Sequence, residues 1–367
     1  MSLTLNLRAL ARRTLCVAAF FSAGAVCAQE PAPAPVTGAD AAVLRVDTYG
    51  HTVADLDKTL AFYHDLLGLE MSAVPEKPKA NAVLGKLTNL NGAEFRSARV
   101  KIPNAAFELA LLEVTGVPRT PGSGRHTDPG VVVLNLSVRD IDVAFKVLKA
   151  AGVPTMNDGA TPTRLSGDTR AVWVRDPDGY LVEIIQRDAR SWFSVPPPSL
   201  APVPGSRYVI NGALGMTVAD LDRGLALYHD VFDFKLKEKQ VVLRPDMAEM
   251  VGISQQALFR VALGNCAWIR CELYQFGNLP QTPLRLRIQD PGAPIMGLYV
   301  NNLEQVKSRM VTNGAQVVGP DGAAVRDGET LRVLMQDRDG IYIELMQKRG
   351  VGPTPAPPGT PPSPITP

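Results

Sequence analysis

Hydrophobic side chains recur at helical spacing in two similar stretches of the chain, residues 51–70 and 216–235. The periodic positions are Leu56, Leu60, Tyr63 and Leu67 in the first stretch and Leu221, Leu225, Tyr228 and Phe232 in the second. Asp55 and Asp220 precede them, where an aspartate can accept a hydrogen bond from a free N–H of the first helical turn. These two aspartates are 165 positions apart, so the pattern predicts two copies of one strand–helix design.

Each copy contains a weaker repeat of the same pattern. Residues 138–142 restate residues 53–57, and a second helical pattern follows them. Both halves end on a similar sequence, RDPDGYLVEIIQ from Arg175 and QDRDGIYIELMQ from Gln336, where Asp-Gly between strand-like runs predicts a hairpin. The chain therefore reads as four modules, each a strand, a helix and about three further strands, which is an α+β fold.

Pro-rich segments divide the chain into regions. We predict a signal peptide at 1–28, a Pro- and Ala-rich leader at 29–42, one domain at 43–190, a Pro-rich linker at 191–206, a second domain at 207–348 and a Pro-rich disordered tail at 349–367. The prolines of the linker stiffen it, so the two domains are expected to keep a preferred angle.

The N-terminal segment has the pattern of a secretory signal peptide. Three arginines precede an apolar run from Leu15 to Val26, and Val26-Cys27-Ala28 provides a cleavage site before Gln29. The run is too short for a comfortable membrane span. We therefore expect cleavage and a periplasmic or secreted protein, and the sequence leaves open whether Cys27 carries a lipid.

Removal of the signal peptide changes the charge and the cysteine count. The formal net charge of +2 becomes −1, because three arginines leave with the peptide. No basic patch or charge block then indicates a nucleic acid or an anionic membrane surface as partner. Cys266 and Cys271 remain. On one extended strand they would lie roughly 16 Å apart, beyond disulfide reach, so we expect two half-buried thiols.

The helix sequence VADLDKTLAFYHDLLGL and the closing DPDGYLVEI resemble the vicinal oxygen chelate superfamily. This group includes glyoxalase I, extradiol dioxygenases, and fosfomycin and bleomycin resistance proteins. The resemblance covers nearly all of residues 43–348. It implies βαβββ modules that pair so that their curled sheets enclose a cavity, which gives two tandem domains with one cavity each.

The resemblance also implies where a divalent ion would be held, by histidines of first strands and glutamates of last strands. The first-strand positions are Thr48, Val133, Ala213 and Ile295, and the last-strand positions are Ala110, Glu183, Glu272 and Glu344. Transition-metal sites of this kind need imidazole among about three protein ligands. We therefore expect no cofactor and no metal site of the usual kind, although a divalent cation on carboxylates alone stays open. His51 is an odd number of residues from Thr48, which places it on the opposite face, between sheet and helix.

Glu272 and Glu344 are the candidate catalytic pair. If both enter one cavity, one of them should hold its proton to higher pH, or both should share a hard cation. Strand alternation puts Trp268, Arg270 and Tyr274 on the same wall as Glu272, a set that suits a planar or anionic organic ligand. Glu183 is the equivalent candidate for ligand binding in the first half. His126 lies in a Gly-rich loop and has no identifiable partner.

Three functions fit these observations. The first is an exported protein that binds a small organic molecule without the usual metal. The second is a lyase, isomerase or dioxygenase that acts through Glu272 and Glu344. The third is an interaction module whose cavities have closed. The fold alone cannot select among them, and the sequence identifies neither the substrate nor the oligomeric state.

Overall fold

The computed structural model describes residues 42–72, 74–156, 161–188, 207–239, 245–254, 256–319 and 322–352. The predicted signal peptide, the linker, nearly all of the leader and most of the tail lie outside these residues. None of the described helices is both long enough and apolar enough to cross a membrane.

The four predicted modules are present. The first contains β1 (Val43–Val53), α1 (Leu56–Leu60) with its π-helical continuation η1 (Ala61–Leu66), β2 (Lys79–Ala80), α2 (Ala82–Thr88), β3 (Glu94–Lys101) and β4 (Glu108–Thr115). The second contains β5 (Val132–Val138), α3 (Ile141–Ala150), β6 (Thr163–Ser166), β7 (Thr169–Arg175) and β8 (Leu181–Gln186). The third contains β9 (Val209–Thr217), α4 (Leu221–Tyr228), β10 (Lys235–Lys239), α5 (Pro245–Met250), β11 (Leu258–Cys266) and β12 (Ile269–Gly277). The fourth contains β13 (Pro294–Val300), α6 (Leu303–Thr312), β14 (Gln316–Val317), β15 (Val325–Asp327), β16 (Thr330–Gln336) and β17 (Tyr342–Lys348).

The aspartates that precede the two repeated helices cap them as predicted. Asp55 accepts a hydrogen bond from the Lys58 N–H at 3.1 Å, and Asp220 accepts one from the Arg223 N–H at 3.0 Å. Each cap satisfies a backbone donor that the helix itself leaves unpaired. The start of each helix is therefore fixed by local sequence.

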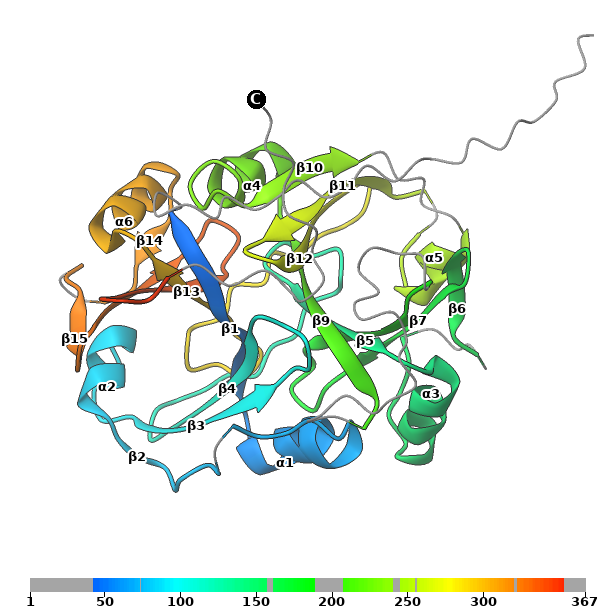
Figure 1. Cartoon of the computed structure of the whole chain (residues 1–367), viewed down its shortest axis with the longest axis horizontal. Coiled ribbons are helices and arrows are strands. Elements are labelled where there is room, and N and C mark those ends of the chain that lie inside the picture. Colours follow the sequence, from blue (N-terminus) through cyan, green and yellow to red (C-terminus); the bar gives the residue numbers. More distant parts are fainter. Residues whose placement is uncertain are drawn as a thin grey trace, which may run out of the picture. The chain divides into compact units, whose positions relative to one another are not determined.

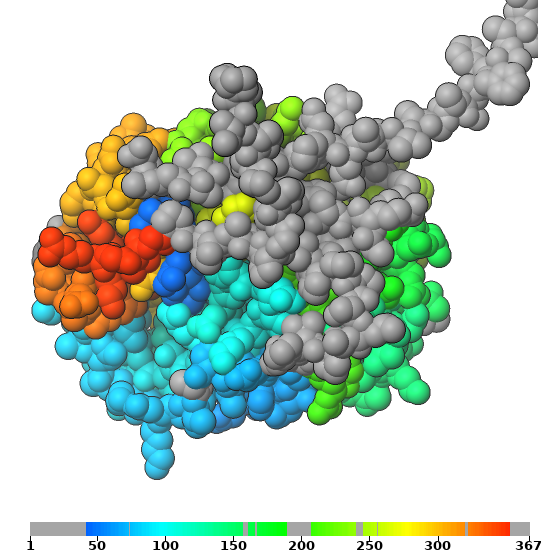
Figure 2. All heavy atoms as spheres, in the orientation of Figure 1, coloured from blue at the N-terminus to red at the C-terminus, as the bar shows by residue number. Residues whose placement is uncertain are grey.

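The strands form two sheets, and each sheet takes one module from the first half of the chain and one from the second (Figure 1). The first sheet has the order β14-β16-β17-β13-β1-β4-β3-β2, with β15 on β16, and joins modules one and four. The second has the order β10-β11-β12-β9-β5-β8-β7-β6 and joins modules two and three. In the space-filling view, β1 (blue) lies between cyan residues of the first module and orange and red residues of the fourth (Figure 2).

The predicted fold class is confirmed, an α+β protein with curled sheets of paired modules, but the partner of each module differs from the one expected. The sequence repeat suggested that residues 43–190 and 207–348 would each build a sheet. Instead, β1 pairs antiparallel with β13, and β5 pairs antiparallel with β9. As a consequence, residues expected in one cavity are distributed over two.

Matched contacts relate the two halves by approximate two-fold symmetry. The hydroxyl of Thr52 donates to the Ile288 carbonyl at 2.6 Å, and that of Thr217 donates to the His126 carbonyl at the same distance. The Thr120 N–H donates to Asp290, and the Thr282 N–H donates to Asp128, both at 2.8 Å. The loop between the modules of each half therefore bonds to the other half of the chain. His126 and Ile288 occupy equivalent positions in these two loops.

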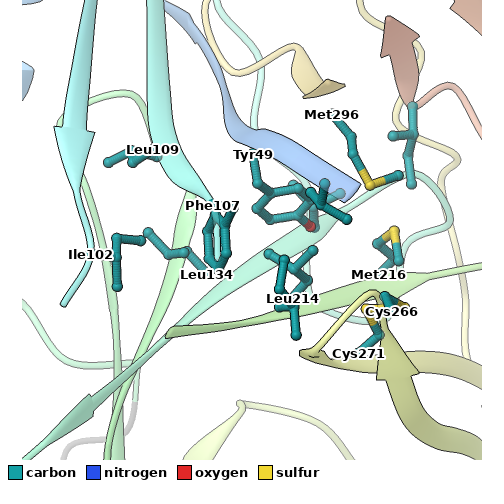
Figure 3. Packing of buried hydrophobic residues seen from close by; sticks show 14 of the residues in the cluster. Tyr49, Ile102, Phe107, Leu109, Leu134, Leu214, Met216, Cys266, Cys271 and Met296 are labelled. Atoms are coloured by element: carbon teal, nitrogen blue, oxygen red, sulfur yellow. A yellow bond between two sulfur atoms is a disulfide. The ribbon is translucent and has the colours of Figure 1, made fainter. Parts of the chain in front are cut away.

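The main hydrophobic core lies on the helix-facing sides of the sheets. Leu134 of β5 and Leu214 of β9 are register partners and both belong to it. Tyr49 of β1 lies among them (Figure 3), and its hydroxyl donates to the Gly215 carbonyl at 2.9 Å, which joins the two sheets. Burial of one such leucine side chain contributes about 1.5–3 kcal/mol. Alternation along β5 places Val133 and Asn135 on the opposite, concave face.

Cys266 and Cys271 form a disulfide, so the prediction of two free thiols is wrong. The chain does not stay extended between them but reverses at Ala267 and Trp268, which have φ values of 50° and 72°. Two residues with positive φ make the tight hairpin turn that joins β11 to β12. The turn brings the two Cα atoms to 5.9 Å, well within disulfide reach (Figure 3).

We predict that replacing both cysteines by serine destabilises the protein by about 2 kcal/mol, the loop entropy expected for a cross-link that closes a short loop. Urea denaturation followed by circular dichroism measures the change. An unchanged midpoint, or free thiols at Cys266 and Cys271 after alkylation of the native protein, would contradict the bond.

Candidate functional site

The concave face of the second sheet brings two glutamates together. Asn135 of β5 is in register with Glu183 of β8, and Gly215 of β9 is in register with Glu272 of β12. Register partners on neighbouring strands share a face of the sheet, so both carboxylates project to the concave side. Their charges interact. This face and the side chains over it are called the polar chamber below.

Glu272 is held in its ionised form. It is buried, and its carboxylate accepts hydrogen bonds from the Arg270 guanidinium and the Tyr274 hydroxyl. Burial raises its pKa, but the positive charges of Arg270 and Arg187 outweigh this effect and hold the pKa below the usual range. Glu272 is therefore a fixed negative charge of the polar chamber.

Glu183 behaves differently from Glu272. Burial raises its pKa to about 7, Arg187 opposes this shift, and the charge of Glu272 adds to it. At neutral pH, Glu183 therefore exchanges a proton while Glu272 stays ionised. We predicted that one carboxylate of the pair Glu272 and Glu344 would hold its proton to higher pH. In the structure, Glu183 and not Glu344 is the carboxylate beside Glu272.

His126 contributes a neutral imidazole to the polar chamber. Its ring is buried and packs edge-on against Trp173 at 4.5 Å, Tyr274 at 4.9 Å and Phe276 at 5.0 Å between centroids. Burial lowers its pKa to about 3, against the attraction of Glu272, so the ring carries no charge at neutral pH. A neutral imidazole can donate or accept one hydrogen bond at each nitrogen.

Several buried polar atoms of the polar chamber have no hydrogen-bond partner in the described part of the chain. They are His126 Nδ1, both side-chain polar atoms of Asn135, Arg187 Nη2 and Trp268 Nε1. Each such group destabilises the folded protein by about 1–3 kcal/mol, so a cluster of them marks a place where another molecule supplies partners. A cavity of about 30 Å³ lies beside two of these residues, Arg187 and Trp268, and Ser137, Ala213 and Arg270 also line it.

The equivalent face of the first sheet lacks these polar groups. Ala110 stands for Glu272, Ile288 for His126, Leu334 for Trp173 and Gly297 for Asn135. Leu87 of α2 packs with Ile288, Leu334 and Tyr342 in an apolar cluster there. Glu344 remains on this face at the position of Glu183, where it binds Arg332. The chain therefore contains a polar version and a more apolar version of the same face, and the second is called the apolar face.

The structure brings most of the predicted site residues together, with one exception. Arg270 and Tyr274 contact Glu272 as strand alternation predicted, and Trp268 lines the cavity beside Arg270. Glu344, the predicted partner of Glu272, lies on β17 in the other sheet and binds Arg332 instead. It lies in the other sheet because module four pairs with module one.

Sequence reasoning missed Arg187, Asn135 and the role of His126. The internal repeat held a usable signal for them, since comparing equivalent positions shows polar residues in one chamber and apolar residues in the other. That comparison needed the module pairing, which only the sheet order supplies.

The polar chamber does not fit the divalent ion that this type of fold often holds. Val133 and Ala213 occupy the two positions from which histidines would reach the ion. Of the remaining carboxylates, Glu272 is engaged by Arg270 and Tyr274. The two arginines add positive charge that repels a cation. The described residues therefore offer no metal site of the usual kind in this chamber.

One other group has the geometry of metal ligands, namely His51, Asp176 and Asp178, the only such group within the described ranges. His51 Nε2 lies 2.9 Å from Asp176 Oδ2 and 3.8 Å from Asp178 Oδ2. Tyr63 donates to Asp176 at 3.0 Å, and Thr59 donates to Asp178 at 2.7 Å. Burial lowers the pKa of His51, but the two aspartates overcome this effect and raise it to about 9. The group is therefore an ion pair at neutral pH, and a metal would have to displace the imidazole proton.

In the second half of the chain, the equivalent contact between helix and hairpin forms without a histidine. Met216 takes the place of His51, and Tyr228 donates to Asp337 at 2.9 Å as Tyr63 does to Asp176. Burial and the neighbouring Asp339 raise the pKa of Asp337 to about 7. In each half of the chain, this tyrosine–aspartate hydrogen bond joins the first helix to the hairpin at the end of that half. We therefore assign His51 a structural role, on the strand face opposite Thr48 as parity predicted.

The fold defines a class of protein, one built from paired βαβββ modules with curled sheets. The chain belongs to the Glyoxalase/Bleomycin resistance protein/Dioxygenase superfamily, whose model matches residues 45–184 and 211–345. Members of this superfamily often bind a divalent metal.

Known proteins support the same assignment. A lactoylglutathione lyase of Arabidopsis thaliana is 25% identical over 206 residues, which are 55% of this chain but only 59% of that protein. A lactoylglutathione lyase of Haemophilus influenzae is 27% identical over 134 residues, 36% of this chain and 86% of that protein. The crystal structure of glyoxalase I from Zea mays matches with a TM-score of 0.53 and 18% identity, over 83% of this chain and 92% of that chain. The structural match shows the shared fold.

We predict that His51→Met lowers stability most at acidic and neutral pH. The pKa of His51 is raised from 6.5 to about 9, so its stabilisation is complete below about pH 6.5 and is lost as pH rises through 9. The difference from wild type should approach an order of 3 kcal/mol at pH 6 and shrink towards pH 10. Urea denaturation across this range measures it, with the half-exposed His64→Gln as control. A difference independent of pH would exclude the ion pair.

Proposed function

We propose that the protein binds a small organic ligand in the polar chamber, without the His and Glu metal site that its family often uses. The main support for this proposal is that equivalent positions on the two concave faces carry polar residues in one sheet and mostly apolar residues in the other. Keeping unpaired polar groups buried destabilises a fold, and at the equivalent positions of the first sheet Ala110, Ile288 and Leu334 carry no polar side-chain group. A ligand that supplies hydrogen-bond partners explains why the second sheet retains them.

We predict that His126→Ile, which copies the residue of the apolar face, weakens ligand binding at least tenfold without lowering the free energy of unfolding. The substitution removes an unpaired buried nitrogen and keeps a similar volume. Thermal-shift screening of small organic acids, amides and ketones at pH 7 identifies a ligand, and calorimetry measures its affinity. Ile288→Val, in the equivalent position of the other sheet, is the control and should bind normally. Equal loss in both variants would argue against a site in the polar chamber.

A second candidate function is proton transfer by a lyase or isomerase. The specific observation in its favour is Glu183, whose pKa of about 7 suits a general acid or base, beside the ionised Glu272. Two relatives bear the name lactoylglutathione lyase, so formation of lactoylglutathione is the first reaction to assay. The role proposed for Glu272 is to keep Glu183 protonated up to neutral pH.

If the protein is such an enzyme, Glu183→Gln should reduce kcat at least a hundredfold, while Glu344→Gln should leave it nearly unchanged. Glutamine cannot exchange a proton, and Glu344 lies in the other sheet bound to Arg332. A chelator should have no effect, because the polar chamber has no suitable metal ligands. Activity that disappears with chelation would reject this mechanism and restore the metal-dependent one.

We also infer that the protein is exported. The N-terminal pattern of residues 1–28 supports this, as does the Cys266–Cys271 disulfide, since such bonds persist in oxidising compartments. Fractionation of cells that express the full chain, with mass analysis of the N-terminus, tests the proposal. Retention in the cytoplasm with residues 1–28 intact would refute it.

A further inference from the structure

We propose that the ligand of the polar chamber is a small carboxylate, whose acid group binds between Arg187 and Arg270 beside Trp268. The inference deepens the proposed function and rests on it, because it assumes that the polar chamber is a ligand site. It is carried by the cavity geometry, by the distribution of charge around it and by a comparison with the equivalent positions of the first sheet.

The cavity is lined by two arginines and by residues with short side chains. Arg187 and Arg270 both line it, together with Ala105, Ser137 and Ala213, whose short side chains leave room near the arginines. A volume of about 30 Å³ accommodates about two water-sized groups, which is the size of a carboxylate head. Guanidinium groups bind carboxylates through paired N–H donors, so two of them define an acid-binding pocket.

The charges around the cavity leave a net positive excess. Arg270 is paired with Glu272 through a hydrogen-bonded ion pair. Arg187 Nη2 is buried without a hydrogen-bond partner, and Glu183, the other carboxylate, is protonated in part at neutral pH. Burial and repulsion from Arg270 both lower the pKa of Arg187. A carboxylate in the cavity relieves this repulsion and pairs with the buried guanidinium.

Trp268 is held over the cavity by an unfavourable backbone conformation. Its φ of 72° lies in the left-handed region, which bulky residues avoid, and its indole N–H is buried without a partner. The Cys266–Cys271 disulfide closes the hairpin at this turn. Local strain of this kind is retained at ligand sites, and here it aims one further hydrogen-bond donor and an aromatic face at the ligand.

The first sheet has different charged residues at the positions of the two arginines. Glu108 occupies the position of Arg270, and Lys348 that of Arg187. Glu108 forms an ion pair with Arg99, and Lys348 is exposed, 3.9 Å from Glu329. The positions of Arg187 and Arg270 therefore carry no arginine in the first sheet, whose Arg332 binds Glu344, and each offers a matched control position.

Calorimetric titration of the full chain at pH 7 with acetate and benzoate tests the proposal, with acetamide and benzamide as neutral counterparts. Wild type should bind the carboxylates and bind the amides at least tenfold more weakly. Arg187→Gln should weaken carboxylate binding at least tenfold, Arg187→Lys should give an intermediate loss, and Lys348→Gln should behave as wild type. If Arg187→Gln does not fold, the affinity of Arg187→Lys and the comparison of acids with amides still test whether Arg187 binds a carboxylate.

Equal binding of acids and amides, or normal binding in a folded Arg187→Gln, would overturn the carboxylate assignment. A neutral ligand that binds and is lost in His126→Ile would refute the carboxylate while leaving the proposed function intact. Absence of binding for every compound of the screen would remove both.

Discussion

Antiparallel pairing between first strands of different modules is the interaction on which the rest of the structure depends. β1 pairs with β13 and β5 with β9, and each of these strands also pairs in parallel with the last strand of its own module. One pairing therefore decides which two last strands flank a concave face. It places Glu183 opposite Glu272 and leaves Glu344 in a separate sheet. The chemistry of the protein follows from this choice of partner.

The two faces differ in polarity although they share one backbone scaffold. The hydrogen bonds from Thr52 and Thr217, identical in length, show that the backbone framework has stayed the same. On the first face, Ile288 and Leu334 stand where the second face has His126 and Trp173, and they pack with Leu87 in an apolar cluster that stabilises the fold. The second face keeps charged and unpaired groups that weaken the fold. Residues that lower the stability of the fold are expected to be retained at functional sites.

Local patterns in the sequence predicted the elements, the helix caps, the family and the wall formed by Arg270, Glu272 and Tyr274, because these depend on spacing within one strand or helix. They could not predict the partner of each module, since both arrangements satisfy the same local patterns. The disulfide was missed for a related reason. Ala267 and Trp268 carry no Asn-Gly signal, so the reversal between Cys266 and Cys271 looked like continuous strand.

The absence of imidazole at the first-strand positions of the polar chamber and the presence of two arginines beside it are physically connected. Two buried carboxylates repel each other strongly unless positive charge lies nearby. In metal-dependent relatives of this fold the ion provides that charge. Here Val133 and Ala213 cannot bind a metal, and Arg187 and Arg270 lower the energy of ionised Glu272 from within the chain. The positive charge is thus fixed to side chains with directional donors. A site of that kind favours recognition of an anion and leaves proton transfer, where it occurs, to Glu183.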